Sequence, residues 1–100
     1  MNRRFTEAQM LADLRITFPT LWTRPLREFG KDFKREGVWT GEDVAAMPDG
    51  MPIFFSLANG EPPYNGFVHE AFEAWLDRRG WCVETYDGGT HHLLPVEHTT

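Results

Sequence analysis

The chain lacks several features that identify particular classes of protein. Its 100 residues include one cysteine, Cys82, which excludes an internal disulfide framework and a zinc site made of cysteines alone. No apolar run approaches the roughly 20 residues that span a bilayer, and the first residues lack the apolar core of a signal peptide. No repeat or long linker divides the chain. We therefore expect one domain over residues 1–100 in a reducing compartment, with frayed ends at 1–5 and 97–100 and no membrane partner.

Composition and charge narrow the class further. With 41% hydrophobic and 14% aromatic residues, the chain is too apolar to be disordered. The formal net charge of −5 argues against a protein that grips phosphate backbones. Charge is uneven, because residues 1–36 contain eight of the ten basic side chains and residues 37–100 contain ten of the fifteen acidic ones. This asymmetry affects which partners each part of the surface attracts.

The first third of the chain predicts two helices. Thr6 and Gln9 form a capping-box pattern, in which each side chain satisfies a free amide of the first turn, for a helix over residues 7–18. Apolar residues at helical spacing predict a second helix over residues 24–36. Gly30, in its middle, costs about 1 kcal/mol relative to alanine and weakens that interpretation.

The remainder of the chain predicts strands and one strong helix. Residues 38–47 fit either a short strand or a single helical turn, and the apolar run 52–57 reads as a strand. The segment 68–79 predicts a helix lying on the core, and residues 81–86 and 91–96 alternate around Asp-Gly-Gly as a β-hairpin does. The expected fold is therefore α+β, a small domain with two to three helices packed on a short antiparallel sheet, and a C-terminal helix followed by a hairpin. The apolar stripe of the strong helix consists of Val68, Ala71, Phe72, Trp75 and Leu76.

Groups that could carry chemistry are few. Ser56 is the only serine and has no nucleophile-elbow sequence around it. Cys82 could face His91 or His92 across the hairpin, but a lone cysteine in an apolar strand is more often a small core residue. Adjacent histidines on a strand point to opposite faces and do not readily share an ion. We therefore expect no metal, no cofactor and no enzymatic activity, and we read His69 as a polar surface group or helix cap.

The most distinctive polar feature is a series of carboxylates in the last third. Three follow the outer side of the predicted helix, and two lie in the hairpin, so together they could present one acidic surface to a basic partner. A solvated face that keeps the protein dissolved is the plainer interpretation. The preceding loop contains two aromatic side chains beside rigid prolines, which could act as apolar anchors in an interface. The candidate partner-binding residues are Glu70, Glu73, Asp77, Glu84 and Asp87, with Tyr64 and Phe67 as anchors.

Two stretches resemble segments of known proteins. VHEAFEAWLDRRGW, residues 68–81, followed by ETYDGGT, residues 84–90, resembles segments of short bacteriophage and prophage accessory proteins. The wider profile is similar to that of the phage-encoded inhibitors of bacterial defence called anti-CRISPR proteins, which are small, often acidic and usually without catalytic motifs. The resemblance implies a way of acting, namely to occupy the surface of a host nucleic-acid-binding protein or complex and exclude its ligand. It carries over no site residue.

Two functions from different classes follow, besides a metal-assisted enzyme built on His69, His91 and His92, which the lack of metal-ligand spacing disfavours. The first is a non-enzymatic inhibitor in the cytoplasm of a bacterial host, which binds the basic surface of a protein or ribonucleoprotein through its acidic face. The alternative is a small nucleic-acid-binding or regulatory protein that uses the basic N-terminal third, where aromatic residues lie between the cations. Carboxylates interleaved with those cations at i, i+4 spacing favour ordinary helix-stabilising pairs instead.

Overall fold

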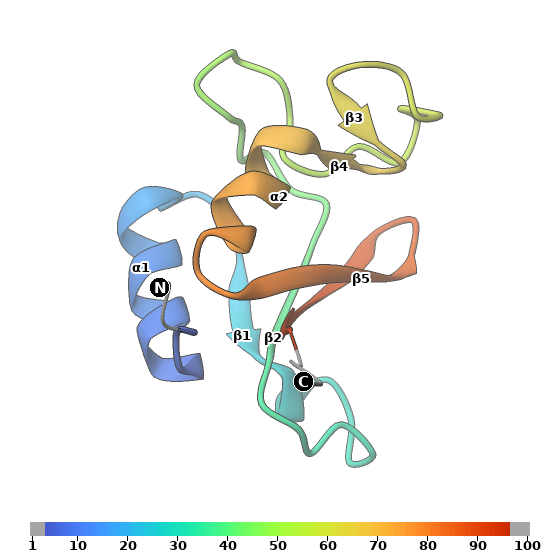
Figure 1. Ribbon diagram of the computed structural model, residues 1–100. Helices are drawn as coiled ribbons and strands as arrows, with labels where there is room; N and C mark the ends of the chain where they lie inside the picture. Colours follow the sequence, from blue (N-terminus) through green and yellow to red (C-terminus); the bar gives the residue numbers. More distant parts are fainter. Residues whose placement is uncertain (1–3, 97–100) are drawn as a thin grey trace.

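An antiparallel sheet of four strands forms the centre of the structure, a computed structural model that describes residues 4–96 (Figure 1). Its spatial order is β1-β2-β6-β5, so the last strand in sequence lies inside the sheet. A separate two-stranded ladder pairs β3 with β4. The expected α+β class is confirmed, with two α-helices beside these sheets. The strands are β1 (Thr23–Pro25), β2 (Val38–Gly41), β3 (Tyr64–Asn65), β4 (Val68–His69), β5 (Trp81–Asp87) and β6 (Thr90–Pro95).

Helix α1 (Glu7–Thr17) begins as its sequence predicts. The Thr6 hydroxyl accepts the Gln9 amide N–H, and the Gln9 side chain accepts the Thr6 N–H, so the capping box is present. The helix buries Met10 and Leu14 against the sheet. Among the ends expected to fray, residues 1–3 and 97–100 lie outside the described part of the chain. Phe5 is not frayed, because its N–H donates to the Arg79 carbonyl at 2.9 Å.

Helix α2 (Glu70–Asp77) lies beside β5, and α1 lies beside β1 (Figure 1). We call the side of the sheet that α2 covers its inner face and the opposite side its outer face. Helix α2 is shorter than the expected 68–79 segment, because the first two residues of that segment pair with β3 as the strand β4. Phe72, Trp75 and Leu76 are buried in the core, whereas Ala71 is exposed. Alternate residues of the sheet complete this core, with Val38, Leu93 and Trp81 all at most 1% exposed.

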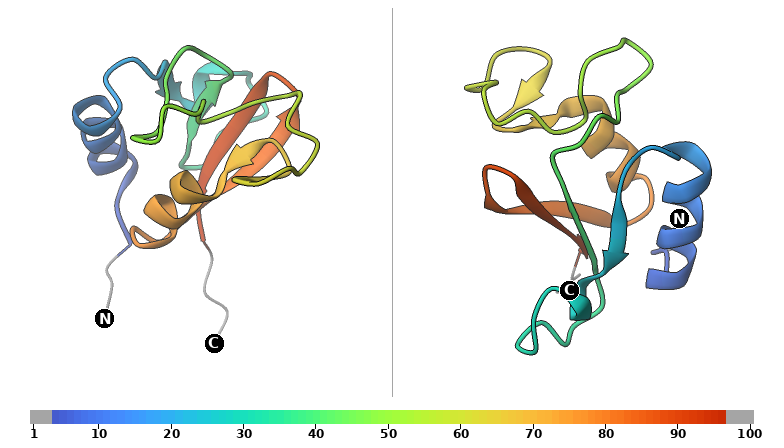
Figure 2. Two further views of the ribbon diagram at one scale, coloured as in Figure 1. Left: turned by 90° about the horizontal axis from the view of Figure 1, so that it is seen from above. Right: turned by 180° about the vertical axis from the view of Figure 1, so that it is seen from behind.

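The expected helix over residues 24–36 is wrong. The chain there forms β1, a single 3-10 turn η1 (Leu26–Glu28) and an irregular loop (Figure 2). Phe29 and Phe33 fold over the outer face of the sheet, where each ring lies about 5 Å from the His92 ring, at 4.8 and 5.2 Å. Phe29 and Phe33 have helical spacing but belong to a loop that covers the sheet. Their contacts with the distant His92 outweigh the local preference for a helix.

Two further segments differ from the alternatives that their sequence offers. Residues 38–41 form strand β2, and the following residues contain no helical turn, so the strand interpretation of 38–47 holds for its first part. The expected strand over 52–57 is wrong, because the chain makes only isolated bridges there, Ala46 with Pro52 and Phe54 with Val68. Its apolar residues serve instead to fill the core, since Ile53 and Phe54 are at most 1% exposed.

The turn between β5 and β6 packs closely on β2. A Cβ atom added to Gly41 would lie 2.3 Å from the Gly89 carbonyl oxygen, whereas one added to Gly88 would meet only the Ser56 Cβ, at 3.6 Å. We expect Gly41→Ala to lower the free energy of unfolding by about 1–3 kcal/mol, because backbone must move to relieve the contact. Urea denaturation measures this, with Gly88→Ala as the matched control. Equal destabilisation by the two variants would contradict the packing described.

Candidate functional site

The carboxylates predicted on α2 form a row on its solvent side, which we call the α2 acidic row: Glu70, Glu73 and Asp77. Glu70 and Asp77 are exposed, and Glu73 is half-buried and accepts a hydrogen bond from the Asn65 side chain at 3.0 Å. The opposite side of the helix is buried, so the backbone that carries the row is fixed. The row spans about 10 Å along the helix axis at 1.5 Å per residue.

Helix electrostatics explain two members of the row and not the third. Glu70 and Glu73 stand in the first turn, where a negative charge interacts favourably with the helix dipole. Asp77 is the last residue of α2, where the same dipole disfavours a carboxylate by about 0.3–1 kcal/mol. Within the described chain, no hydrogen bond or ion pair of the Asp77 side chain offsets this cost. The fold thus gives no reason for an acid at this position.

The two acids expected to extend the row lie elsewhere. Along β5, Val83 and Thr85 face the core side that α2 covers, so Glu84 leaves the sheet on the opposite face. Asp87 lies at the turn, where its carboxylate accepts the Gly89 N–H at 3.0 Å. The structure therefore does not join all five predicted acids into one surface. Glu84 is separated from the row because side chains alternate between the two faces along a strand. Only the three acids of the α2 acidic row form a continuous line.

The expected aromatic anchors do not fit that role equally. Tyr64 is only 6% exposed, and its hydroxyl donates to the Pro52 carbonyl at 2.6 Å. It is a buried residue that ties β3 to the 46–52 segment, so its assignment as an exposed anchor is wrong. Burial also raises the pKa of its phenol. Phe67 is half-buried, so part of its ring remains accessible.

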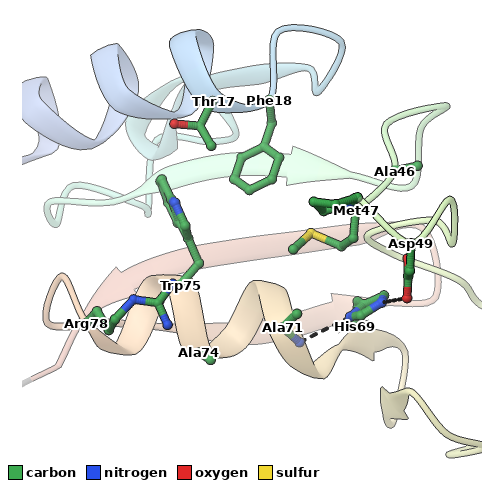
Figure 3. A pocket seen from close by; sticks show the side chains of 11 residues that line it. Thr17, Phe18, Ala46, Met47, Asp49, His69, Ala71, Ala74, Trp75 and Arg78 are labelled. Atoms are coloured by element: carbon green, nitrogen blue, oxygen red, sulfur yellow. Dashed lines mark hydrogen bonds and ion pairs between the residues drawn. The ribbon is translucent and has the colours of Figure 1, made fainter.

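A groove of about 670 Å³ lies between α1 and α2 (Figure 3). Phe18 and Trp75 form its apolar walls, and Arg78 lies at one end. At the other end His69 contacts Asp49, with 2.7 Å between Nε2 and the carboxylate oxygen. The lining is mostly apolar and small, with three alanines, Ala46, Ala71 and Ala74.

The His69–Asp49 pair holds the groove together. His69 caps α2, because its Nδ1 accepts the Ala71 N–H at 3.1 Å. Nε2 therefore carries the ring proton and donates it to Asp49. This hydrogen bond, with a second from the Met51 N–H, lowers the pKa of the Asp49 carboxyl. Since both nitrogens are engaged, the ring fixes the 46–52 turn to the helix and has no free lone pair to act as a base. The capping prediction for His69 is confirmed, but the side chain is buried.

His91 and His92 point to opposite faces of β6, as their adjacency predicts. His91 is fully buried, stacks on Phe54 with 4.1 Å between ring centroids, and pairs through Nδ1 with the Thr85 hydroxyl at 3.0 Å. His92 is packed beneath the aromatic rings of the outer face. Among residues 4–96, Nε2 of each ring is buried without a hydrogen-bond partner. Desolvation lowers the pKa of His91 to about 4 and lowers that of His92 as well, so both are neutral at pH 7.

The two nucleophile candidates are not activated. Partial burial of its sulfur, followed by the charge of Glu84, raises the pKa of the Cys82 thiol, which opposes thiolate formation. Cys82 pairs with Leu94 across the sheet, and His91 lies on the other face. The Ser56 hydroxyl donates to the Glu42 carboxylate at 3.0 Å. Sequence reasoning missed this pair and the His69–Asp49 pair, because contacts between distant loops leave no periodic pattern.

Within the basic first third, β1, η1 and the loop that follows them carry cations near the outer aromatic rings. Several of these cations are paired: Arg24 contacts Glu28 at 2.6 Å, and Arg27 contacts Glu7 at 2.8 Å. Only the first of these pairs has the expected i, i+4 spacing. Lys31 and Lys34 are exposed beside Phe33. The structure therefore gathers aromatic and basic side chains in one region, as the alternative function requires, while neutralising part of the charge.

Comparison with known proteins found no matching family model, no similar curated protein and no similar solved structure. Over residues 4–96, no group of three or more histidine, cysteine, aspartate or glutamate side chains is placed to hold a metal ion. Neither helix in this described part is long and apolar enough to cross a membrane.

Burial of the histidines predicts how stability depends on pH. The folded-state pKa of His91, about 4, lies below the unfolded value of about 6.5, so the unfolded chain binds the proton first as the pH falls. We expect the free energy of unfolding to decrease by about 2–3 kcal/mol between about pH 7.5 and about pH 4.5 through His91 alone. Urea denaturation at several pH values measures this. His91→Leu should flatten the profile, and an unchanged slope in that variant would contradict the assignment.

Proposed function

We propose that this chain is a non-enzymatic inhibitor that docks the α2 acidic row on the basic surface of a host nucleic-acid-binding protein or complex. Carboxylates held on a rigid helix can pair with the lysine and arginine side chains of a partner that otherwise bind phosphate groups. The proposed setting is a bacterial cytoplasm during phage infection, in the manner of the anti-CRISPR proteins that the sequence resembles. The acids outside the row, Glu84 and Asp87, have no part in this contact.

The observation that carries the proposal is the position of Asp77. Residues that lower stability without a structural return are often kept for function. Asp77 opposes the dipole of its own helix, has no compensating partner in the described chain, and continues the line of Glu70 and Glu73. A purely solubilising acid could stand at many exposed positions that cost nothing. The placement of this one supports a docking role for the row.

The partner follows from charge and from rigidity. A row of negative charge increases the rate of encounter with a basic surface and loses that advantage as salt screens it. A basic surface that is already shaped for nucleic acid offers cations at regular spacing, to which an ordered helix can bind without paying the entropy of folding. We therefore expect binding to compete directly with nucleic acid and to weaken with ionic strength.

A substitution at Asp77 separates docking from stability. We expect Asp77→Asn to raise the free energy of unfolding by about 0.5 kcal/mol, because it removes a charge opposed to the helix dipole. The same change should weaken partner binding. A charge-reversed variant, Asp77→Lys, should lower the affinity by about tenfold or more, which corresponds to about 1.4 kcal/mol. Asp32→Lys changes net charge equally at an exposed loop position and is the matched control.

The experiment has two steps. Immobilised wild-type chain first captures proteins from nuclease-treated bacterial lysate, and each captured protein is then purified and titrated with labelled nucleic acid in the presence of wild type or variant. The proposal predicts that wild type and Asp32→Lys displace the nucleic acid, whereas Asp77→Lys does so only at much higher concentration. Nucleic-acid binding that persists when the captured protein is saturated with wild-type chain would refute inhibition. Equal potency of the two lysine variants would refute the role of the row.

The outer face supports nucleic-acid binding as a second candidate function. Tyr86 is 58% exposed, and its ring lies 4.9 Å from that of Phe29, close to the cations of the loop. Exposed aromatic rings beside cations can stack the bases of a single strand. Against this, Phe29 and Phe33 meet each other edge to face at 4.9 Å and are half-buried, so little ring surface remains for bases.

Fluorescence anisotropy with a labelled single-stranded oligonucleotide distinguishes the two candidates. Because we assign docking to α2, we expect no saturable complex with the oligonucleotide at about 10 µM chain. Even non-specific nucleic-acid binding proteins usually have dissociation constants near this concentration, so a chain that binds nucleic acid would be detected. A complex that weakens steeply between about 50 mM and about 200 mM salt, and that is lost in Tyr86→Ala, would establish the second candidate in place of the first. Asp77→Lys is the control, since this variant should not affect binding at the outer face.

A further inference from the structure

A second surface lies where β1 begins and β2 ends, next to the turn between β5 and β6. It is a cleft of about 370 Å³ lined by two indole rings, those of Trp22 and Trp39, and by the carboxylates of Glu42 and Asp43. Trp22 is 43% exposed, so a large part of its indole ring is accessible from solvent. The cleft contains no residue of α2 or of the α2 acidic row. We call it the indole–carboxylate cleft.

Strand register creates the corner between the two rings. Thr23 pairs with Thr40, so Trp22 and Trp39 are diagonal neighbours on the outer face of the sheet. Their centroids lie 4.6 Å apart, and their planes stand at 88° to each other. Gly41, the next outward position on β2, adds no side chain to fill the space. The two perpendicular indole rings therefore form a corner that opens into the cleft.

Among the described residues, only uncharged groups donate hydrogen bonds to the two carboxylates. Asp43 accepts the backbone N–H groups of Trp22 and Val44, at 3.3 and 2.7 Å. Glu42 accepts the backbone N–H and the hydroxyl of Ser56, at 3.0 Å each. These bonds orient the acids without neutralising them, and within the described chain neither acid forms an ion pair. The cleft thus combines two negative charges with the electron-rich face of an indole.

We propose that the indole–carboxylate cleft binds a guanidinium group, the side chain of an arginine in a partner polypeptide. A cation is favoured both by the carboxylates and by the quadrupole of an indole face. Among biological cations the guanidinium is planar, so it can stack on one ring of the corner while its N–H groups, which point outward in its own plane, donate to a carboxylate of the cleft. A lysine ammonium is a compact and strongly hydrated charge that gains less from a flat aromatic wall. This inference does not depend on the α2 acidic row.

The test uses short capped peptides that differ in one group. Ac-Gly-Arg-Gly-NH2 carries the guanidinium, the citrulline peptide is its uncharged isostere, and the lysine peptide has the same charge without the plane. NMR of the indole N–H signals of Trp22 and Trp39 measures binding to the ¹⁵N-labelled chain, and Trp22→Leu assigns one of these signals. We expect saturable shifts with the arginine peptide, with a dissociation constant on the order of millimolar. The citrulline peptide should bind at least about tenfold more weakly.

Variants decide whether the cleft is responsible. Asp43→Asn and Glu42→Gln keep an oxygen that accepts the same neutral donors and remove one charge each, and each should weaken arginine binding several-fold. Asp32→Asn, an exposed acid outside the cleft, and Asp77→Asn on α2 should leave it unchanged. Retained binding in Asp77→Asn separates this site from the proposed inhibitory surface. Equal shifts with citrulline or with lysine, no saturable shift, or full binding by the Asp43→Asn Glu42→Gln double variant would overturn the proposal.

Discussion

The burial of β6 on both of its faces is the constraint on which the rest of the structure depends. As an inner strand, β6 lies between β2 and β5, with a helical core on one side and the aromatic loop on the other. His91 therefore packs against Phe54, and its neighbour His92 packs beneath Phe29 and Phe33. Because a chain of only 100 residues covers both faces of its sheet, the interior is filled by packed side chains and has little room for reactive polar groups. The buried histidines are neutral packing groups, and the polar surfaces lie at the periphery.

The two peripheral surfaces are held in place by the buried residues and paired strands behind them. The α2 acidic row is fixed because Phe72 and Leu76, on the other side of the same helix, are fully buried. The indole–carboxylate cleft is fixed because paired strands set the diagonal contact of Trp22 and Trp39. Both surfaces are rich in carboxylates, although they belong to different elements. A partner with an extended cationic surface could meet either, which makes separate variants of each necessary for assigning roles.

The sequence predicted those features that depend on neighbours along the chain. The capping box of α1, the apolar side of α2 and the opposed directions of His91 and His92 follow from local periods, and each is present. It failed where distant segments decide the outcome. Leu26, Phe29 and Phe33 have helical spacing, yet they belong to a turn and loop that cover the sheet.

The candidate site shows the same division. Glu70, Glu73 and Asp77 lie on one side of a helix as their spacing requires. Glu84 was placed with them wrongly, because a strand residue takes its face from register and not from distance along the chain. Tyr64 looked exposed beside prolines, but its hydroxyl finds the Pro52 carbonyl. No sequence pattern indicates that Trp22 meets Trp39, since β1 is only three residues long.

The central claim, that β6 is buried from both sides and leaves function to the edges, is tested most directly by an NMR titration of the histidine rings. Nitrogen chemical shifts report the protonation and tautomer of each ring as the pH is lowered. The account predicts that His91 titrates with a pKa of about 4 and that His92 also titrates below its ordinary value. Ordinary titration of both rings near pH 6.5 would show that solvent reaches the strand, and would contradict the two-sided packing described here.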